Sequence, residues 1–245
     1  MTPDNAEEFQ GIGDPIYARV RARIRQDILC GVFAPGVRIK IAELSNRYGV
    51  SQMPIREALQ QLQGEGLITI VPNKGARVRS VDERFIRNIY DIRAAIEVLL
   101  ARQSAEAMTD SQIFALHAAQ ARHEEAVQRG DIGKVLEANK NFHELIYRMA
   151  DNPEGMEIIG RHWDLLEGLR RKYGYGPNRL AEMISEHRQL LRALDRHEVQ
   201  LAEKIIREHC EHAKQDLLAQ TRLAPLPQAE PRQAEAAGFI GGVRV

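Results

Sequence analysis

Residues 35–78 read PGVRIKIAELSNRYGVSQMPIREALQQLQGEGLITIVPNKGARV, and this stretch decides the fold of the first third of the chain. Its apolar spacing predicts a helix over residues 41–48, which Gly49 would end in the left-handed conformation. Ser51 is the expected N-cap of a second helix that runs to about Gly64. LITIV, PNKG and ARVRS then predict two short strands around a glycine-containing turn.

The residues before this stretch complete the pattern. Apolar side chains repeat every fourth position from Ile16 to Ile28, which predicts a helix over about 15–30. Helix, helix, turn, helix and hairpin in this order are typical of a winged helix-turn-helix. The chain carries no net charge, but residues 15–80 hold eleven Lys or Arg against four acids. A basic block joined to a mildly acidic remainder indicates a DNA-contacting module attached to something else.

The helix after Ser51 has the pattern of a recognition helix. Its core face is formed by Ile55, Ala58, Leu59 and Leu62, which turns Gln52, Met53, Arg56 and Gln60 outward. Arg56 suits guanine edges or phosphate, Gln52 suits adenine, and the helix N-terminus at Ser51 suits phosphate. On one helix alone, Arg56 and Glu57 would be interpreted as surface charges. The helices, turn and hairpin taken together favour DNA binding. The expected DNA-contacting residues are Arg38, Ser51, Gln52, Met53, Arg56, Lys74, Gly75 and Arg77.

This stretch resembles the winged-helix domain of the GntR family. The resemblance rests on Pro35-Gly36, Ala42-Glu43-Leu44, Gly49-Val50-Ser51, Pro54 to Leu59, Leu62, Glu65-Gly66-Leu67 and Gly75. It implies that Arg56 contacts DNA. The family usually has Arg where this chain has Gln52, so the resemblance does not carry over the specificity of that contact.

Beyond residue 81 the strand signals stop and amphipathic helices follow, with breaks near residues 108–110, 130–131, 152–153, 174–177 and 197. We expect a flexible segment over 1–13, a DNA-binding domain over 14–80, an all-α domain over 81–221 and a disordered tail over 222–245. The fold class is therefore mainly α. No apolar stretch approaches the roughly 20 residues that span a bilayer. The two cysteines form no disulfide framework, so we expect a cytoplasmic protein without a membrane partner.

Three helices of the second half each place a histidine within an apolar stripe. These are His143, His187 and His209, and Asn139 lies one turn before His143. A single buried histidine is usually a hydrogen-bonded core residue, but a buried polar group is costly without a partner. Four such residues together favour one shared metal ion, with His212 as a substitute or an outer contact. His117, His123, His162 and His197 carry no clear signal and are assigned to the surface or to outer contacts.

This half, over roughly residues 83–220, resembles the FCD ligand-binding domain of the FadR subfamily. The resemblance rests on DIRAAIEVLLARQSAE, NKNFHELI, SEHRQLLRALDR and AEKIIREHCEHA. It implies six or seven helices around a cavity and, by its metal-binding branch, ligation by Asn139, His143, His187 and His209. The branch has Asp where this chain has Asn139, so the oxygen ligand would lack its charge. Zinc is the expected ion, and nickel or manganese would also fit.

Arg93 borders the stripe predicted for its helix, which is formed by Phe85, Ile89, Ile92, Ile96 and Leu99. A guanidinium there suits a ligand carboxylate. A salt bridge to Glu97 on the same helix is an equal alternative.

Together these patterns predict a ligand-responsive transcription regulator, with repression released by ligand as the commoner family outcome. A homodimer would bind pseudo-palindromic operator DNA and respond to a small carboxylate. One alternative is a DNA-binding protein whose metal and helical domain are only structural. The other is a metalloenzyme, but no general base is evident beside the ligands, because Glu144 and Glu186 point off the stripes. We therefore expect no enzymatic activity.

Overall fold

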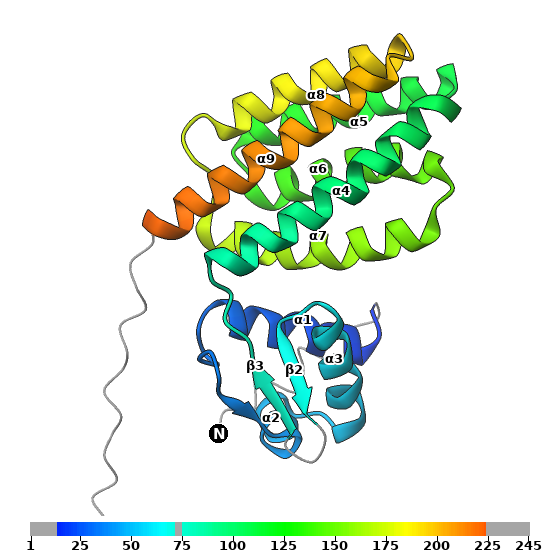
Figure 1. The fold of residues 1–245 in the computed structure, drawn as a ribbon. Coiled ribbons are helices and arrows are strands. Elements are labelled where there is room, and N and C mark those ends of the chain that lie inside the picture. The colour runs from blue at the N-terminus through cyan, green and yellow to red at the C-terminus, as the bar shows by residue number, and fades with distance from the viewer. Residues whose placement is uncertain (1–13, 72–74, 224–245) are drawn as a thin grey trace, which may run out of the picture.

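The computed structural model describes residues 14–71 and 75–223, which form a small N-terminal domain and a larger helical domain (Figure 1). The expected flexible segment 1–13 lies outside the described residues, as do residues 224–245 of the expected tail 222–245. The N-terminal domain contains α1 (Ile16–Leu29), β1 (Arg38–Ile39), α2 (Ile41–Tyr48), α3 (Gln52–Gly64), β2 (Ile68–Val71) and β3 (Gly75–Val78). Its strands form an antiparallel sheet in the order β1-β3-β2. The predicted winged helix-turn-helix is confirmed.

Local chemistry explains most of these boundaries. Gly49 ends α2 with φ of 66°, as the sequence predicts. Ser51 occupies the N-cap position of α3, but its side chain caps no backbone N–H. Strand β1 was not predicted, because two residues are too short to show an alternating pattern. It forms by pairing Arg38 with Arg77 and Ile39 with Ala76 of β3.

The helical domain begins at Glu83, five residues after the end of β3 at Val78, and follows the predicted breaks. Its elements are α4 (Glu83–Ala107), α5 (Asp110–Arg129), α6 (Ile132–Tyr147), a 3₁₀ turn η3 (Arg148–Ala150), α7 (Pro153–Tyr173), α8 (Arg179–Asp195) and α9 (Val199–Leu223). Asp82, Asp131 and Asn152 cap α4, α6 and α7 through their side chains. Helix α9 continues two residues past the expected boundary at 221. Within the described ranges, no helix meets the length and apolarity of a membrane span.

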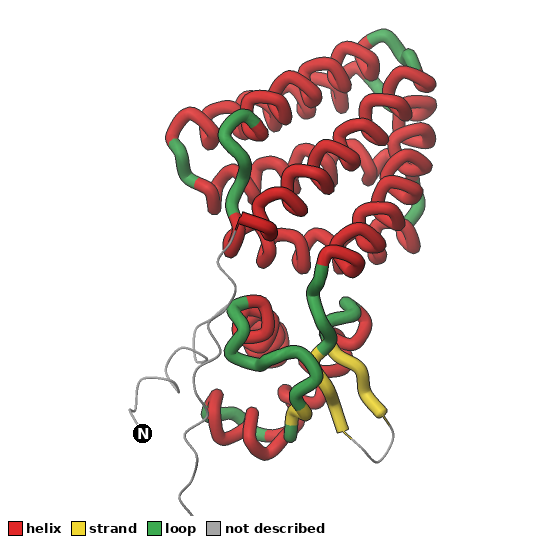
Figure 2. Tube along the Cα trace, turned by 60° about the vertical axis from the view of Figure 1, so that its left-hand side comes forward, coloured by secondary structure: helices red, strands yellow, loops and turns green. Residues whose placement is uncertain are grey.

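The six long helices pack as a bundle above the N-terminal domain, and the wing hairpin lies at the far side of that domain (Figure 2). Helix α4 packs along α9, while α5 packs between α6 and α8. A cluster that includes the fully buried Leu100, Phe142, Ile146 and Leu194 fills the interior. This interior surrounds the three predicted histidines.

Helix α7 connects the two domains. Its Leu165, Leu166 and Leu169 are buried in the same apolar cluster as Ile24 and Leu29 of α1. A Cβ atom at Gly168 would collide with the end of the Leu29 side chain, so a larger residue there would force that side chain to shift within the junction of α7 and α1.

Polar contacts reinforce this junction. Asp164 of α7 contacts Arg21 of α1 at 3.3 Å and Arg25 at 3.6 Å. Arg25 in turn makes two hydrogen bonds of 2.8 and 2.6 Å to Glu65, the C-cap residue of α3. The junction therefore links α7 of the helical domain to the end of the predicted recognition helix.

Candidate nucleic-acid interface and metal centre

Helix α3 presents the side chains that the sequence predicts for base contact. Ile55, Ala58, Leu59 and Leu62 are buried, whereas Ser51, Gln52, Arg56 and Gln60 are exposed. Met53 lies on the same outward face and is 64% exposed. The predicted division between a core face and an outward face is therefore confirmed.

The wing places two further cations side by side. Arg38 and Arg77 are both exposed and lie directly opposite each other on β1 and β3. Like charges in that register repel each other, and a bound anion between them would remove the repulsion. Gly75, with φ of 78°, lies against Arg38, whose Nε would be 3.3 Å from a Cβ added there. Lys74 lies outside the described residues.

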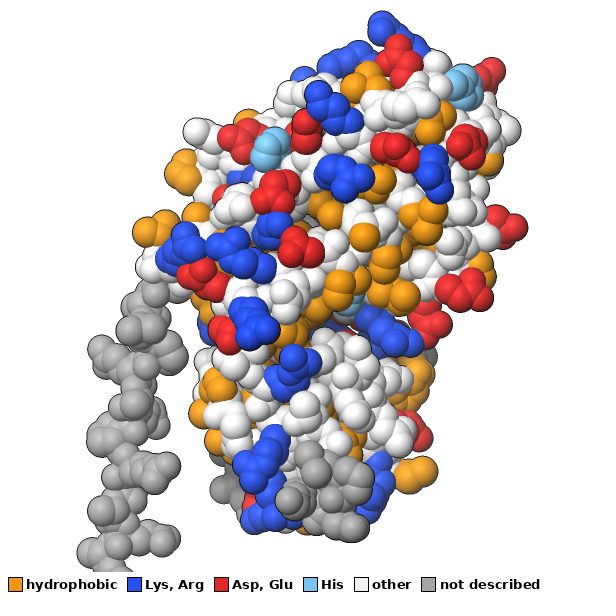
Figure 3. Space-filling model, viewed as in Figure 1, with side chains coloured by type: hydrophobic (Ala, Val, Ile, Leu, Met, Phe, Trp, Pro, Cys, Tyr) orange, Lys and Arg blue, Asp and Glu red, His pale blue; other side chains and the backbone are white. Residues whose placement is uncertain are grey.

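Lys and Arg side chains gather at the end of the N-terminal domain that is remote from the helical domain (Figure 3). The helical domain shows a mixture of both charges in the same view. The basic end and the exposed face of α3 together have the character of a surface for a polyanion.

The structure brings the three predicted histidines together. His143 of α6, His187 of α8 and His209 of α9 are all buried, and each offers a ligand atom within 4.8 Å of the others. Their ring centroids are 5.0 Å (His143–His187), 4.9 Å (His143–His209) and 5.1 Å (His187–His209) apart. Three imidazoles that bind one ion tetrahedrally at about 2.0–2.1 Å would hold their centroids roughly 5 Å apart. The spacing of the three rings matches that arrangement.

Hydrogen bonds set the tautomer of all three rings. Nδ1 of His187 lies 2.9 Å from Oε1 of Gln120, and Nδ1 of His209 lies 2.7 Å from the carboxylate of Glu186. Tyr147 donates its only proton to Glu97 at 2.7 Å, so its oxygen accepts from Nδ1 of His143 at 3.1 Å. Each Nδ1 therefore carries the proton, and each Nε2 keeps its lone pair for a ligand.

Several polar atoms around these rings have no hydrogen-bond partner among the described residues. They include Nε2 of His143, Nε2 of His187 and Oδ1 of Asn139, all buried. An unsatisfied buried polar atom costs about 1–3 kcal/mol. The two imidazole acceptors belong to neighbouring rings and fit a cation, because one ion satisfies both, and Asn139 lies one helical turn before His143 on α6. The residues predicted as metal ligands therefore suit a metal ion by position, burial and donor atoms.

The environment keeps these imidazoles neutral. Burial, the largest cause, holds the pKa of His143 and of His187 well below the ordinary value near 6.5, and neighbouring histidines lower both further. Burial also lowers the pKa of His209, although Glu186 opposes this effect. Burial raises the pKa of Glu186, but hydrogen bonds from His209 and Arg179 together hold that pKa below its usual range. Neutral imidazole is the form that binds metals.

These shifts predict acid sensitivity of the metal-free protein. Burial lowers the pKa of His123 to about 4 and that of His162 to about 4, against about 6.5 in the unfolded chain. Between pH 6.5 and 4 the unfolded chain binds more protons, so the free energy of unfolding should fall as the pH falls through that window. His123 alone should contribute about 2 kcal/mol by pH 5. Urea denaturation of chelator-treated protein at pH 7, 6 and 5 measures this loss.

An exposed histidine provides the control for that measurement. His117 is exposed and lies 3.2 Å from Asp195, and the variant His117→Asn, which keeps both buried histidines, should still lose stability as the pH falls. A urea midpoint that is constant or rises from pH 7 to 5 would contradict the assignment of buried neutral histidines.

Arg93 lies at the centre of the buried face of α4, not at its margin. It is 7% exposed, whereas Ile92, which the sequence assigned to the core stripe, is 48% exposed. The predicted stripe was therefore wrong at Ile92, because α6, α7 and α9 cover the adjacent row of the helix. Arg93 donates to Glu97 at 2.6 Å, as the salt-bridge alternative predicts, and its guanidinium carbon lies 4.7 Å from the Trp163 ring centroid.

A small cavity of about 50 Å³ adjoins His209. Its lining includes Arg93, Asn139, Trp163, Arg170, Arg179 and His209. Arg93 pairs with Glu97, Arg170 pairs with Asp216, and Arg179 pairs with Glu186 and, at 3.7 Å, with Glu182. Arg93 therefore faces both the cavity and Glu97, which makes the two sequence interpretations compatible.

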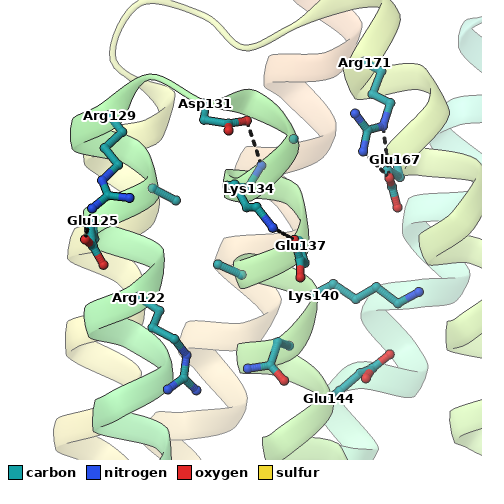
Figure 4. Close-up of a pocket in the computed structure, with 14 residues that line it drawn as sticks. Arg122, Glu125, Arg129, Asp131, Lys134, Glu137, Lys140, Glu144, Glu167 and Arg171 are labelled. Atoms are coloured by element: carbon teal, nitrogen blue, oxygen red, sulfur yellow. Dashed lines mark hydrogen bonds and ion pairs between the residues drawn. The ribbon is translucent and has the colours of Figure 1, made fainter.

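A larger hollow on α5, α6 and α7 has a different character (Figure 4). Its lining includes ion pairs between Arg129 and Glu125, between Lys134 and Glu137, and between Arg171 and Glu167. These charges largely satisfy one another at the surface, so this hollow has little demand for a ligand.

The sequence assigned two residues near the histidines incorrectly or incompletely. Glu186 does not point away from the site, since it accepts from Nδ1 of His209 and also lies 2.7 Å from Nδ1 of His212. His123 is fully buried and lies 5.1 Å from His187 between ring centroids. The signal for His123 was its place on the apolar face of α5, one turn after the buried Ala119 and Gln120.

Comparisons with known proteins agree with the two-domain architecture. The family described as bacterial regulatory proteins, gntR family, matches residues 16–78, and the FCD domain matches residues 88–212, more than half of the chain. The HTH-type transcriptional repressor RspR of Escherichia coli K12 is 33% identical over 156 residues, which cover 64% of this chain and 65% of that relative. The match thus spans slightly less than two thirds of the relative's own length.

Two further comparisons span more of the chain. The uncharacterized HTH-type transcriptional regulator YdhC of Bacillus subtilis 168 is 26% identical, over 82% of this chain and 92% of that protein. The solved structure described as E. coli McbR/YncC superposes with a TM-score of 0.64 at 21% identity, over 86% of this chain and 99% of that one. The structural likeness establishes the shared fold.

Proposed function

Since the chain belongs to the GntR family of bacterial regulatory proteins and carries an FCD domain, we propose that it is a transcription regulator that binds operator DNA and responds to a small carboxylate through a metal ion. The observation that carries this proposal is the cluster of His143, His187 and His209, of which His209 lines a cavity, in a domain that packs against a winged helix through a shared apolar cluster. Relatives that are named as transcriptional regulators or repressors support the proposed role in transcription.

The operator would be read by α3 and held by the wing. Arg56 and Gln52 near the N-terminus of α3 would contact base edges, and Met53 would contact a thymine methyl group or the groove wall. Arg38 and Arg77 would hold phosphates, since a phosphate between them removes their mutual repulsion. A homodimer would place two such surfaces on a pseudo-palindrome. Ile92 on α4, with the half-buried Ile96 and Leu99, supplies an outward apolar row for a second copy.

The metal would be held by Nε2 of the three histidines and by Oδ1 of Asn139. It would supply a Lewis-acidic charge to which a ligand oxygen can bind. Imidazole nitrogens with one amide oxygen suit zinc or nickel, and manganese less well. Gln120, Glu186 and Tyr147 hold the rings in orientation, which is the usual means of strengthening such a site.

The charges around the cavity favour an acid as the effector. All four proposed ligands are neutral, and the nearby carboxylates of Glu97 and Glu186 are each already paired with an arginine. A divalent cation held in this way keeps its charge uncompensated in a buried place. An anionic ligand entering the cavity would neutralise this charge and would meet Arg93, which also lines the cavity. Because Asn139 stands in place of an acidic residue, less of the ion's charge is compensated by the protein, and an anionic ligand is favoured more strongly.

The contacts of α7 provide a route from the cavity to DNA. Trp163 lies against Arg93 and within 5.5 Å of the His143 ring between centroids. The next residue, Asp164, contacts Arg25, which holds Glu65 at the end of α3. An effector that moves Trp163 would therefore change the pose of the winged helices, and operator affinity would change by linkage.

The metalloenzyme alternative is disfavoured by the state of the nearest carboxylates. Both oxygens of Glu186 are occupied by Arg179 and the two histidines, and Glu144 pairs with Arg148 outside the site. Neither is free to act as a general base. The alternative of a purely structural metal predicts operator binding that no carboxylate alters.

The test of the proposed function measures operator affinity by fluorescence anisotropy with the zinc-loaded full chain, using DNA selected from random sequence. We expect at least one of a panel of small mono-, di- and tricarboxylates to change the affinity by roughly 5- to 150-fold. The same acid should raise the melting temperature only when zinc is bound. If the entire panel leaves both quantities unchanged, the structural-metal alternative is favoured.

A variant at the junction separates ligand binding from response. Asp164→Ala should bind zinc and the active carboxylate as the parent does, because Asp164 does not line the cavity. Its operator affinity should respond less to the acid. Glu157→Ala, which removes an exposed carboxylate elsewhere on α7, serves as the matched control.

A further inference from the structure

The cavity beside His209 limits the size of a ligand. Its volume is about 50 Å³. One water molecule needs roughly 10–15 Å³ on the same measure, so the cavity holds roughly three to five waters. A short acid, from acetate to butyrate, has about as many non-hydrogen atoms, whereas a tricarboxylate such as citrate is far larger. The volume therefore favours a short acid.

The two arginines of the cavity wall that come from the end of α7 and the start of α8 are already compensated. Arg170 pairs with Asp216 and also donates to the backbone oxygen of Ala213 at 2.7 Å. Both terminal nitrogens of Arg179 donate to Glu186, at 2.8 and 2.9 Å. A ligand carboxylate placed at either arginine would compete with the acid that the arginine already holds.

The other charged residues of the lining offer no free positive charge either. Arg93 pairs with Glu97. Glu167 also lines the cavity and pairs with Arg171, so it adds a negative charge to the wall. The proposed metal ion would therefore be the one uncompensated positive charge at the cavity, among the residues that the structure describes. One carboxylate has a partner there, and a second carboxylate remote from the ion has none.

Apolar side chains from α6, α7, α8 and α9 form a further part of the wall. These are Leu136, Trp163, Leu166, Met183 and Ala213. Contact with such a wall stabilises a hydrocarbon group and penalises a charge, because the charge loses its water without gaining a partner.

We propose that the effector is a short aliphatic monocarboxylate, whose carboxylate binds the metal ion and whose hydrocarbon body lies against the apolar wall. This inference rests on the proposed function and narrows its ligand class. A dicarboxylate of the same chain length would place its second charge at the apolar wall, away from the ion. The cavity should therefore discriminate against di- and tricarboxylates.

Isothermal titration calorimetry on the zinc-loaded full chain tests this proposal with butyrate and succinate, which share a four-carbon chain and differ by one carboxylate. Butyrate should bind at least roughly tenfold more tightly than succinate, because the second carboxylate is desolvated without a partner. Butyramide, which lacks the charge, and octanoate, which exceeds the cavity, should both bind more weakly than butyrate. Butyrate should bind more weakly still to protein from which a chelator has removed the zinc.

The variant Asp216→Asn should shift this preference toward the dicarboxylate. It removes the charge that compensates Arg170 and keeps an oxygen for the backbone N–H of Gly176, which Asp216 accepts at 3.0 Å. The freed guanidinium then provides a partner for a second carboxylate, so the ratio of succinate to butyrate affinity should rise by roughly tenfold. Glu83→Gln, which breaks an exposed ion pair with Arg222 of the same helix α9, should leave the ratio unchanged.

The outcomes separate this inference from the proposed function. Zinc-dependent binding of succinate or citrate that equals or exceeds that of butyrate would disprove the monocarboxylate class and leave a carboxylate-responsive regulator standing. Octanoate binding as tightly as butyrate would disprove the limit on chain length. If no acid of any class binds the zinc-loaded protein, the proposed function fails, and the inference about its ligand fails with it. The comparison of butyrate with succinate on the parent protein decides the question even if Asp216→Asn does not fold.

Discussion

Replacing both His143 and His187 by alanine should remove the bound metal from the purified protein. Their Nε2 atoms are buried acceptors without a hydrogen-bond partner among the described residues, and both rings lie about 5 Å from His209 between centroids. With two imidazoles lost, only one histidine of the cluster and the amide oxygen of Asn139 remain from the predicted set. Elemental analysis should find about one zinc per chain in the parent protein and almost none in the double variant.

Two variants bracket this result. His117→Ala with His197→Ala removes two exposed histidines and should keep the metal. Asn139→Asp restores a charged oxygen at the same place and should tighten metal binding, because the carboxylate compensates part of the ion's charge. Stoichiometric metal in the His143 and His187 double variant would show that these residues form no shared site.

Replacing Arg56 by alanine should abolish specific operator binding and leave the fold intact. The Arg56 side chain is exposed in the first turns of α3, and no hydrogen bond or ion pair joins it to another described residue. Its loss therefore removes nothing from the folded domain. A bidentate contact with a base is worth about 1–3 kcal/mol, so specific affinity should fall roughly 5- to 150-fold for each half-site.

Gel-shift titrations on the selected operator and on scrambled DNA measure this loss, with circular dichroism as the check on folding. Arg56→Lys keeps the charge without the planar fork, so it should retain binding to scrambled DNA while losing specificity. Arg77→Ala should instead weaken binding to every sequence and reduce its salt dependence. Arg207→Ala, an exposed arginine on α9, is the control for charge. An operator affinity of Arg56→Ala equal to the parent's would contradict the assignment of α3 as the recognition helix.

Most element boundaries were predictable because they depend on local chemistry. Gly49 stops α2, and Asp131 and Asn152 start α6 and α7, through interactions within a few residues. The periodicity of single helices also oriented Asn139, His143, His187 and His209 correctly toward the interior. The two-residue strand β1 escaped prediction, because it exists only through its pairing with β3.

The environment of α4 required the tertiary structure. A helix with apolar residues around more than half of its circumference does not reveal which row its neighbours will cover. The sequence favoured the row of Ile92, whereas α6, α7 and α9 cover the row of Arg93 and Glu97. The charged pair is buried because Tyr147 and Cys210, from α6 and α9, complete the hydrogen bonding of Glu97.

The sequence by itself determined a winged helix-turn-helix, an all-α second domain and three inward histidines, because helix caps, periodicity and turn chemistry act over short distances along the chain. Only the tertiary structure decided that the three rings lie about 5 Å apart, that Glu186 and Gln120 orient two of them, and that His123 is buried beside His187. Those facts depend on how four helices distant in sequence pack against one another. Side-chain spacing across helices is set by that packing, which no local pattern specifies.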